Sequence, residues 1–323
     1  MTGYRAPNWL AGGHAQTIYP LLIKPAPLPY RRERWPTPDG DFIDLDWADP
    51  PAAASGTGST PLLVLFHGLE GSSHSHYARS LMAACQALGW TGVVVHFRGC
   101  SGEINRLPRA YHSGDSAEID WILRRLQQRW PARPTYAVGV SLGGNALLKW
   151  LGEREAAAAT CLRAAAAISA PVDLRASGEQ LARGFNRVYT RHFLYTLKRK
   201  AAEKLRRHPG VFDEGTMRSA RTLYDFDDVV TAPLHGFSSA ADYWRRASSK
   251  PWLRGIRLPT LVLNALNDPF LPASALPTAS QVASAVQLDF PDAGGHVGFV
   301  SGPLPGRLDW LPQRILHYFQ NEV

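Results

Sequence analysis

Gly139-Val140-Ser141-Leu142-Gly143 is the stretch that decides the fold of this chain. It lies between an apolar run at 135–139 and a run at 143–151 with helical periodicity. A serine at such an abrupt strand-to-helix turn forms a nucleophile elbow, and glycines two residues before and after it remove side chains that would collide. The alternative interpretation is a glycine-rich turn with a surface serine, which the flanking pattern disfavours.

Apolar runs of strand length alternate with helical segments on both sides of this turn. We expect strands at 62–66, 92–95, 135–139, 164–169, 260–265 and 286–290, and helices at 77–88, 116–130, 143–151 and 311–319. Alternation of this kind predicts an α/β protein with a mostly parallel central sheet that is flanked by helices. Residues 30–35 and 42–47 surround Asp39-Gly40, which predicts a hairpin at a sheet edge, and a loop is expected over 48–61.

The chain of 323 residues is predicted to be one domain with a helical cap insertion at 171–257. This insertion lacks an apolar strand pattern and holds 17 of the 35 Lys and Arg but only 9 of the 27 Asp and Glu. The whole net charge of +8 therefore lies in the insertion. Residues 1–38 are rich in proline towards their end and are predicted to be an extended N-terminal arm.

Composition excludes several classes of protein. With 45% hydrophobic and 19% charged residues the chain is globular, and three cysteines form no disulfide scaffold. No secretory signal or run of about 18 apolar residues is visible, so we expect a cytoplasmic protein without a transmembrane segment. No metal or nucleotide motif appears, so no cofactor and no metal are predicted.

A serine nucleophile needs a general base, and the base needs an orienting acid. His296 follows the strand at 286–290, and Asp268 follows the strand at 260–265. Both therefore lie just past the carboxyl ends of parallel strands, where such sheets place their sites. The order Ser141, Asp268, His296 suits the elbow. Asp292 is the second candidate for the acid, although it lies only four residues before the histidine.

An oxyanion hole is the third requirement of this chemistry. The stretch His67-Gly68-Leu69-Glu70-Gly71 follows the strand at 62–66. We expect the backbone N–H groups of Leu69 and Leu142 to face the developing negative charge. An ordinary strand-to-helix turn is the alternative interpretation of this loop.

Several motifs together make the sequence similar to a known family, the YheT-like branch of the α/β-hydrolase superfamily. The motifs are Gly13-His14-Ala15-Gln16-Thr17, His67-Gly68-Leu69-Glu70-Gly71, Arg98-Gly99-Cys100-Ser101-Gly102, Asn105-Arg106-Leu107-Pro108-Arg109, Tyr111-His112-Ser113-Gly114-Asp115, Gly139-Val140-Ser141-Leu142-Gly143-Gly144-Asn145 and Asn267-Asp268-Pro269-Phe270. The similarity runs from about residue 5 to the end. It implies a serine hydrolase that uses Ser141, Asp268 and His296.

Other residues in these motifs have weaker interpretations. His14, His67, Glu70 and Asn145 are candidates for lining the substrate pocket. His67 is more typical of a residue that braces its loop. Arg98 and Asp115 are predicted to form a buried ion pair, and Cys100 is predicted to be a small buried hydrophobe.

The insertion contains a basic stretch made of Lys198, Arg199, Lys200, Lys204, Arg206 and Arg207. A solvated helix face is its simplest interpretation. Peripheral contact with acidic membranes or with an anionic substrate is the alternative. Nucleic acid is not expected as a partner, since no nucleic-acid motif accompanies the charge.

These observations predict hydrolysis of a carboxylic ester, of short-chain or lipid type, through an acyl-enzyme on Ser141. The same triad also suits an acyltransferase, a thioesterase or an amidase. A non-enzymatic binding protein that has kept the scaffold is the remaining alternative. The natural substrate does not follow from the sequence.

Overall fold

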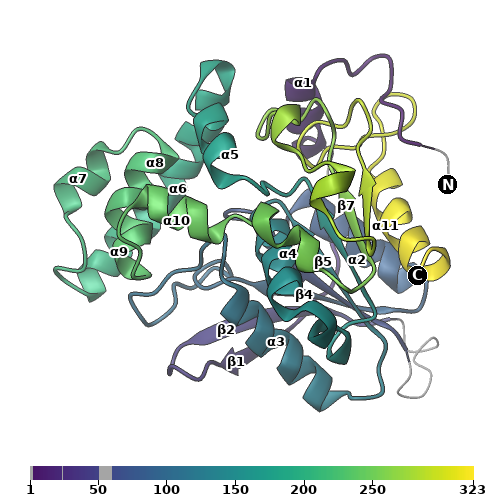
Figure 1. Cartoon of the computed structure of the whole chain (residues 1–323), viewed down its shortest axis with the longest axis horizontal. Coiled ribbons are helices and arrows are strands. Elements are labelled where there is room, and N and C mark those ends of the chain that lie inside the picture. The colour runs from purple at the N-terminus through teal and green to yellow at the C-terminus, as the bar shows by residue number, and fades with distance from the viewer. Residues whose placement is uncertain (1–2, 24, 51–59) are drawn as a thin grey trace.

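The structure is a computed structural model of the chain, and it describes residues 3–23, 25–50 and 60–323. Most of the insertion 171–257 lies at one side of the molecule, and the sheet lies at the other side beside both termini (Figure 1). Residues 51–59 of the loop expected over 48–61 lie outside the described residues.

The described residues form one large sheet and helices that surround it. The strands are β1 (Arg31–Pro36), β2 (Phe42–Ala48), β3 (Leu62–Phe66), β4 (Thr91–His96), β5 (Thr135–Val140), β6 (Ala164–Ile168), β7 (Thr260–Leu263) and β8 (Val286–Asp289). The helices are α1 (Gly13–Ile18), α2 (His76–Ala87), α3 (Ser116–Arg129), α4 (Leu142–Arg154), α5 (Leu174–Leu181), α6 (Arg187–Arg207), α7 (Glu214–Ser219), α8 (Leu223–Phe226), α9 (Ala232–Leu234), α10 (Ala240–Ala247) and α11 (Trp310–Asn321).

The strand order in the eight-stranded sheet is β1-β2-β4-β3-β5-β6-β7-β8. The strands from β4 to β8 along this order are parallel, while β1 and β2 are antiparallel to their neighbours. The predicted α/β class and the hairpin around Asp39-Gly40 are confirmed. At the sheet edge Arg32 and Arg34 of β1 pair with Asp46 and Asp44 directly opposite on β2, which gives this edge strand a charged surface.

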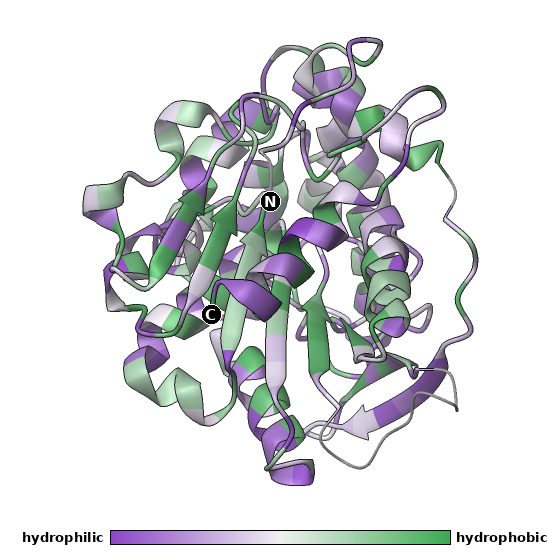
Figure 2. Ribbon diagram, turned by 90° about the vertical axis from the view of Figure 1, so that its right-hand side faces the viewer, coloured by the Kyte–Doolittle hydropathy of each residue, from purple (hydrophilic) through white to green (hydrophobic). Residues whose placement is uncertain are grey.

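The central strands are buried on both faces because consecutive side chains point to opposite sides of a strand. In β3, Leu62 and Val64 pack in one hydrophobic cluster with α3 and α4, while Leu63 and Leu65 pack in a second cluster with α2 and α11. Figure 2 shows the central strands as largely hydrophobic, with helices on either side. This two-sided burial explains why the strands appear in the sequence as continuous apolar runs.

The N-terminal arm differs from the prediction in one respect. Residues 13–18 form helix α1, followed by a 3-10 turn at Tyr19–Leu21, so the prediction of an extended arm over 1–38 is wrong there. The proline-rich part begins at the turn, where Pro20 occupies a position that tolerates the missing N–H group. The Gly12-Gly13 start of α1 lies before this proline-rich part.

The insertion 171–257 contains helices α5 to α10 and no strand. Leu194, Ala201, Met217, Phe226 and Val230 form a small hydrophobic cluster of their own within it. Some of the segments that connect these helices are short 3-10 helices, and Asp227–Thr231 forms a π-helical turn. Across the described ranges of the chain, the structure has no helix that is both long and apolar enough to cross a membrane.

Arg98 and Asp115 do not pair with each other as predicted, although each forms a buried ion pair with other residues. Arg98 is buried and pairs with Asp39, Asp41 and Glu118, at N–O distances of 2.8, 3.2 and 2.8 Å. Asp115 instead accepts hydrogen bonds from Arg109. The sequence supplied the right charges, but the hairpin brought two carboxylates to Arg98 from a distant part of the chain.

The close approach of α4 to strand β3 gives a test of the fold. A Cβ atom added to Gly143 would lie 2.4 Å from the carbonyl oxygen of Phe66. We expect Gly143→Ala to lower the free energy of unfolding by about 1–3 kcal/mol, because the backbone must shift to relieve the collision. Urea unfolding followed by circular dichroism measures this change.

Gly215→Ala is the matched control, because its new Cβ would meet only Asp213 Oδ1, at 3.5 Å. It should leave the unfolding free energy unchanged or raise it slightly. Equal stability of the two variants would contradict the packing described here.

Candidate active site

Ser141 lies at the junction of β5 and α4. Its backbone has φ 52° and ψ −119°, a left-handed conformation that costs energy for a residue with a side chain. A Cβ added to Gly139 would lie 2.5 Å from the carbonyl oxygen of Gly143, so glycine is required at this turn. The nucleophile elbow geometry expected from the sequence is present, and Ser141 lines a cavity.

A hydrogen-bonded chain joins the three candidate catalytic residues. The Ser141 hydroxyl lies 2.9 Å from His296 Nε2, and His296 Nδ1 lies 2.9 Å from Asp268 Oδ2. The Asp268 carboxylate has no exposed surface, and its Oδ1 accepts the backbone N–H of Phe270 at 2.8 Å. The histidine therefore donates from Nδ1 to the carboxylate and can accept the serine proton at Nε2.

The second candidate acid does not take part in this chain. Asp292 is exposed, and both ring nitrogens of His296 are already engaged by Ser141 and Asp268. Asp292 lies where strand β8 has just ended, and its side chain points to solvent. The structure thus distinguishes two aspartates that the sequence left open.

The ring and backbone of His296 are held by neighbours from two segments, helix α1 and the loop after β7. The Phe270 ring stacks on the imidazole, with ring centroids 4.0 Å apart and an angle of 21° between planes. The His296 N–H donates to Thr17 Oγ1 at 2.9 Å. The N–H of the preceding Gly295 donates to Asn267 Oδ1 at 3.0 Å. These contacts fix the orientation that the two ring hydrogen bonds require.

Gln16 is a buried positioning residue that the sequence reasoning missed. Its Oε1 accepts hydrogen bonds from the Gly294 N–H and from Asn267 Nδ2, both at 2.9 Å. Its Nε2 donates to the Leu10 carbonyl at 2.8 Å. Helix α1 thereby connects the loops after β7 and β8. The motif at 13–17 was a visible signal, but only His14 was singled out in it.

The turn after β3 presents one free amide. The N–H groups of Gly68, Glu70 and Gly71 donate to Tyr77 Oη, Tyr111 Oη and the Gly68 carbonyl. The Leu69 N–H has no acceptor among the described residues. A Cβ added to Gly68 would lie 3.2 Å from the Ser141 Cβ, so the turn lies against the serine.

Leu142 supplies the second expected amide. It is the first residue of α4, so its N–H has no acceptor within the helix. The positive end of the helix dipole also points towards the residue before it, which is Ser141. The two amides named from the sequence therefore belong to the two backbone segments that border the serine.

Glu70 links this turn to the insertion. It has a left-handed backbone with φ 56° and lines the cavity, as predicted. Its Oε1 accepts hydrogen bonds from Tyr111 Oη and from Lys200 Nζ of α6, both at 2.8 Å.

Cys100 was predicted to be a small buried hydrophobe. Burial raises the pKa of its thiol to about 11, so the thiol is neutral at pH 7.

The prediction of pocket lining is wrong for three of the four candidates, His67, Asn145 and His14. His67 is fully buried, with Nδ1 2.7 Å from the Gly68 carbonyl and Nε2 accepting from the Phe97 N–H. Burial lowers its pKa to about 3, so it is a neutral brace of the loop. Asn145 is buried in α4 and bonds to the backbone of Ser113, Ala247 and Ser249.

His14 lies at the rim of the cavity and is not among the described lining residues. Its Nδ1 is 3.1 Å from Tyr189 Oη, and its ring contacts that of Phe185 at 4.7 Å between centroids. It therefore touches a lining residue from outside. This contact joins α1 to the first turn of α6.

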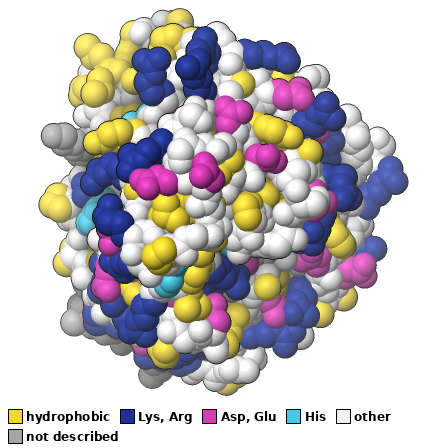
Figure 3. Space-filling view, turned by 90° about the vertical axis from the view of Figure 1, so that its left-hand side faces the viewer, with side chains coloured by type: hydrophobic (Ala, Val, Ile, Leu, Met, Phe, Trp, Pro, Cys, Tyr) yellow, Lys and Arg dark blue, Asp and Glu magenta, His cyan; other side chains and the backbone are white. Residues whose placement is uncertain are grey.

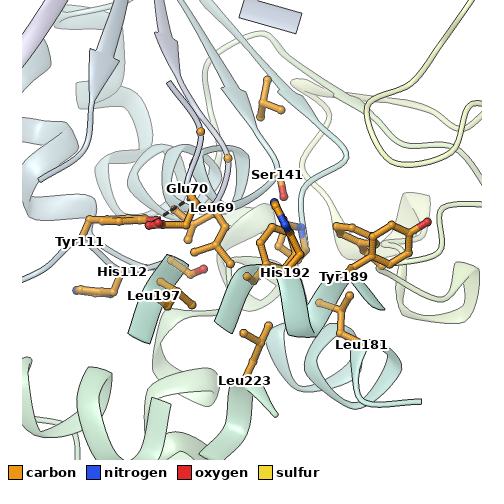
Figure 4. A pocket seen from close by; sticks show the side chains of 18 of the residues that line it. Leu69, Glu70, Tyr111, His112, Ser141, Leu181, Tyr189, His192, Leu197 and Leu223 are labelled. Atoms are coloured by element: carbon orange, nitrogen blue, oxygen red, sulfur yellow. Dashed lines mark hydrogen bonds between the residues drawn. The ribbon is translucent and has the colours of Figure 1, made fainter. Parts of the chain in front are cut away.

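The cavity above Ser141 has a volume of about 520 Å³. Figure 4 shows Leu181, Leu197 and Leu223 of the insertion on one side of it and Ser141 on the other. Asp227 also lines the cavity and accepts hydrogen bonds from Trp244 Nε1 and Thr231 Oγ1. Burial raises the pKa of Asp227 to about 6. Apolar groups supply most of the cavity surface, and charged residues such as Glu70, Lys200 and Asp227 also line it.

Most of the predicted basic stretch is engaged within the protein. Lys204 is buried and donates to the Asn105 side chain and to the Leu107 carbonyl, and burial lowers its pKa to about 8. Lys198 donates to backbone carbonyls, and Arg206 and Arg207 pair with Glu203. Arg199 has no such partner among the described residues.

Comparison with known proteins agrees with this geometry. A family model described as alpha/beta hydrolase fold matches residues 61–303. The chain belongs to this family. The YheT protein of Escherichia coli (strain K12) is 43% identical over 94% of this chain and 88% of its own length. The predicted YheT-like α/β hydrolase is therefore confirmed.

Two further similarities extend this result. Human Phospholipase ABHD3 is 30% identical over 98% of this chain and 78% of its own length. Among solved structures, mouse alpha/beta hydrolase domain-containing protein 10 matches with a TM-score of 0.56 at 15% identity, covering 91% of this chain and 100% of that one. The structural match shows the shared fold, and the sequence relatives support a hydrolase.

The role of Gln16 can be tested through stability. We expect Gln16→Leu to lower the free energy of unfolding by about 1–3 kcal/mol, because the buried N–H donors of Gly294 and Asn267 lose their acceptor. Urea denaturation measures the change. Gln128→Leu, on the exposed face of α3, is the control and should shift stability by less than about 0.5 kcal/mol. Equal effects would contradict a bracing role for Gln16.

Proposed function

We propose that the chain hydrolyses carboxylic esters through an acyl-enzyme formed on Ser141. The observation that carries this proposal is the hydrogen-bonded chain from Ser141 through His296 to Asp268, with the serine at an apolar cavity. A serine hydroxyl needs an adjacent base at neutral pH, and the base needs an orienting acid. The arrangement meets both requirements.

In the first step, His296 Nε2 takes the hydroxyl proton of Ser141 while Oγ attacks the ester carbonyl carbon. The Asp268 carboxylate holds the Nδ1 proton and stabilises the imidazolium that forms. The amides of Leu69 and Leu142 bind the oxyanion. The imidazolium then donates its proton to the alcohol oxygen as the ester C–O bond breaks, which leaves the acyl group on Ser141.

In the second step, a water molecule attacks the acyl carbonyl carbon. His296 takes a proton from this water, and the same amides bind the second oxyanion. The C–O bond to the serine breaks, and His296 returns the proton to Oγ. The products are the alcohol from the first step and the carboxylic acid from the second.

The walls of the cavity support a substrate with an apolar acyl chain. We propose that 171–257 is a cap within a single hydrolase domain and that it binds an apolar acyl chain and excludes water. Leu181, Leu197 and Leu223 supply the apolar surface. A human relative is named a phospholipase, which is consistent with an ester of lipid type.

Replacement of the nucleophile tests the mechanism directly. Ser141→Ala should reduce the hydrolysis of a p-nitrophenyl ester by at least about 10⁴-fold, because no acyl-enzyme can form. It should also abolish labelling by a fluorophosphonate, detected by mass spectrometry. Ser80→Ala on α2 is the control and should retain both activities. Turnover by Ser141→Ala near the wild-type rate would rule out this nucleophile.

The two candidate acids can be separated by isosteric substitution. Asp268→Asn should lower kcat by about 10⁴-fold, because an amide no longer fixes the imidazole tautomer or stabilises its positive charge. Asp292→Asn should leave kcat within about twofold, since its side chain is exposed to solvent. Steady-state kinetics measure kcat of each variant, and the midpoint of urea unfolding shows whether each variant is folded. A large loss in the Asp292 variant alone would show that the acid is misassigned.

A further inference from the structure

Exposed hydrophobic side chains concentrate around one end of the cavity. Leu21 and Leu22 follow α1 with exposures of 64% and 69%, and Val188 and Tyr195 of α6 have exposures of 55% and 63%. Leu21 also lines the cavity, so it stands at the opening. Isolated exposed leucines are common on proteins, but a cluster at a cavity entrance indicates a binding surface.

The two segments that carry these residues are in contact. His14 of α1 lies 3.1 Å from the Tyr189 hydroxyl of α6, as described above. Along α6, Val188, His192 and Tyr195 are spaced by four and three residues, so they share one helix face. His192 lines the cavity as well. The apolar residues therefore form one surface at its entrance, which we call the mouth surface: Leu21, Leu22, Val188 and Tyr195.

Positive charge borders the mouth surface without compensation. Arg187, Arg191 and Arg199 of α6 are exposed, and none forms an ion pair with any residue that the structure describes. Six other arginines of the insertion have close acidic partners: Arg175 pairs with Glu179, Arg206 and Arg207 with Glu203, Arg218 with Glu214, and Arg245 and Arg246 with Asp242. Arg183, Arg221, Arg254 and Arg257 of the insertion also form no ion pair with a residue that the structure describes. What distinguishes α6 is that its three unpaired arginines stand on the same helix as Val188 and Tyr195.

The face presented by the insertion shows the same association. In Figure 3, hydrophobic side chains lie next to Lys and Arg side chains along the upper edge of this face. A helix that exposes apolar residues beside unpaired basic residues is typical of proteins that lie on anionic lipid. The apolar residues enter the headgroup region, and the arginines contact the phosphates.

We propose that the mouth surface docks on an anionic lipid bilayer and opens the cavity onto it. The biological role of this docking rests on the proposed ester hydrolysis. Docking adds to that proposal by naming the lipid surface as the source of the ester. It also revises the sequence-based expectation of membrane contact. The residues concerned are Arg187, Arg191 and Arg199, since Lys200 and Lys204 are engaged internally.

Vesicle co-sedimentation of the full chain tests docking without turnover. We expect binding to vesicles of phosphatidylcholine mixed with phosphatidylglycerol, and much weaker binding to phosphatidylcholine alone. Arg187→Gln/Arg191→Gln should reduce the partition coefficient by about 30-fold, since each arginine near an anionic surface contributes about 1 kcal/mol. Raised salt should weaken wild-type binding, because it screens these charges.

Matched variants show whether binding depends on the mouth surface itself or only on net charge or exposed apolar residues in general. Arg245→Gln/Arg246→Gln removes the same charge from arginines paired with Asp242 and should retain binding. Leu22→Asp/Val188→Asp should abolish binding, while Leu88→Asp should not. Leu88 follows α2 at the opposite edge of the sheet and is 44% exposed.

The outcomes are distinguishable from failure of the catalytic proposal. Ser141→Ala should lose ester turnover and still sediment with anionic vesicles. Absence of wild-type binding, or equal losses in the mouth and control variants, would overturn the docking proposal and leave the hydrolase proposal standing. Sedimentation equilibrium gives a further check. A dimer that Leu22→Asp/Val188→Asp dissociates would show instead that a second copy of the chain covers this surface.

Discussion

The imidazole of His296 is held between two oxygen atoms, and much of the surrounding structure serves to keep it there. A carboxylate on one side and a hydroxyl on the other are each 2.9 Å from a ring nitrogen. Such an arrangement survives only when ring rotation and loop movement are blocked. The Phe270 ring blocks the first, and the hydrogen bond from the His296 N–H to Thr17 restricts the second. The N-terminal helix α1 is thus part of the site, although it lies at the far end of the chain.

The insertion is coupled to the serine through contacts of a different kind. Lys200 reaches from α6 to Glu70, in the turn whose Leu69 amide is free. Asn145, one helical turn after Ser141, binds the backbone of Ala247 and Ser249 at the other end of the insertion. Movement of the insertion would therefore disturb both the turn after β3 and the start of α4. Because of these contacts, a change in the shape of the cavity would also change the surroundings of Ser141.

Charge has two separate roles in the insertion. Where arginine and acidic residues are three or four positions apart on a helix, they neutralise each other and support the helix. Buried Lys204 satisfies three acceptors of the loop at 105–109 and leaves no charge at the surface. The excess of positive charge seen in the sequence is consequently reduced, and three of the arginines left without an acidic partner, Arg187, Arg191 and Arg199, lie on α6. Their neighbours are apolar residues at the cavity entrance.

The sequence by itself determined the strands and helices, the elbow and the chain order of its candidate partners. Continuous apolar runs are local signals, and parallel strands end at the same edge, so the sequence alone predicted that Ser141, Asp268 and His296 meet there. Only the tertiary structure showed that Asp268 and not Asp292 lies against His296, which carboxylates pair with Arg98, and that Gln16 lies under the histidine loop. Each of these depends on a hydrogen bond or ion pair between residues far apart in the chain, such as Gln16 and Gly294. Periodicity and spacing carry no information about such contacts, because they arise only when the sheet brings separate loops together.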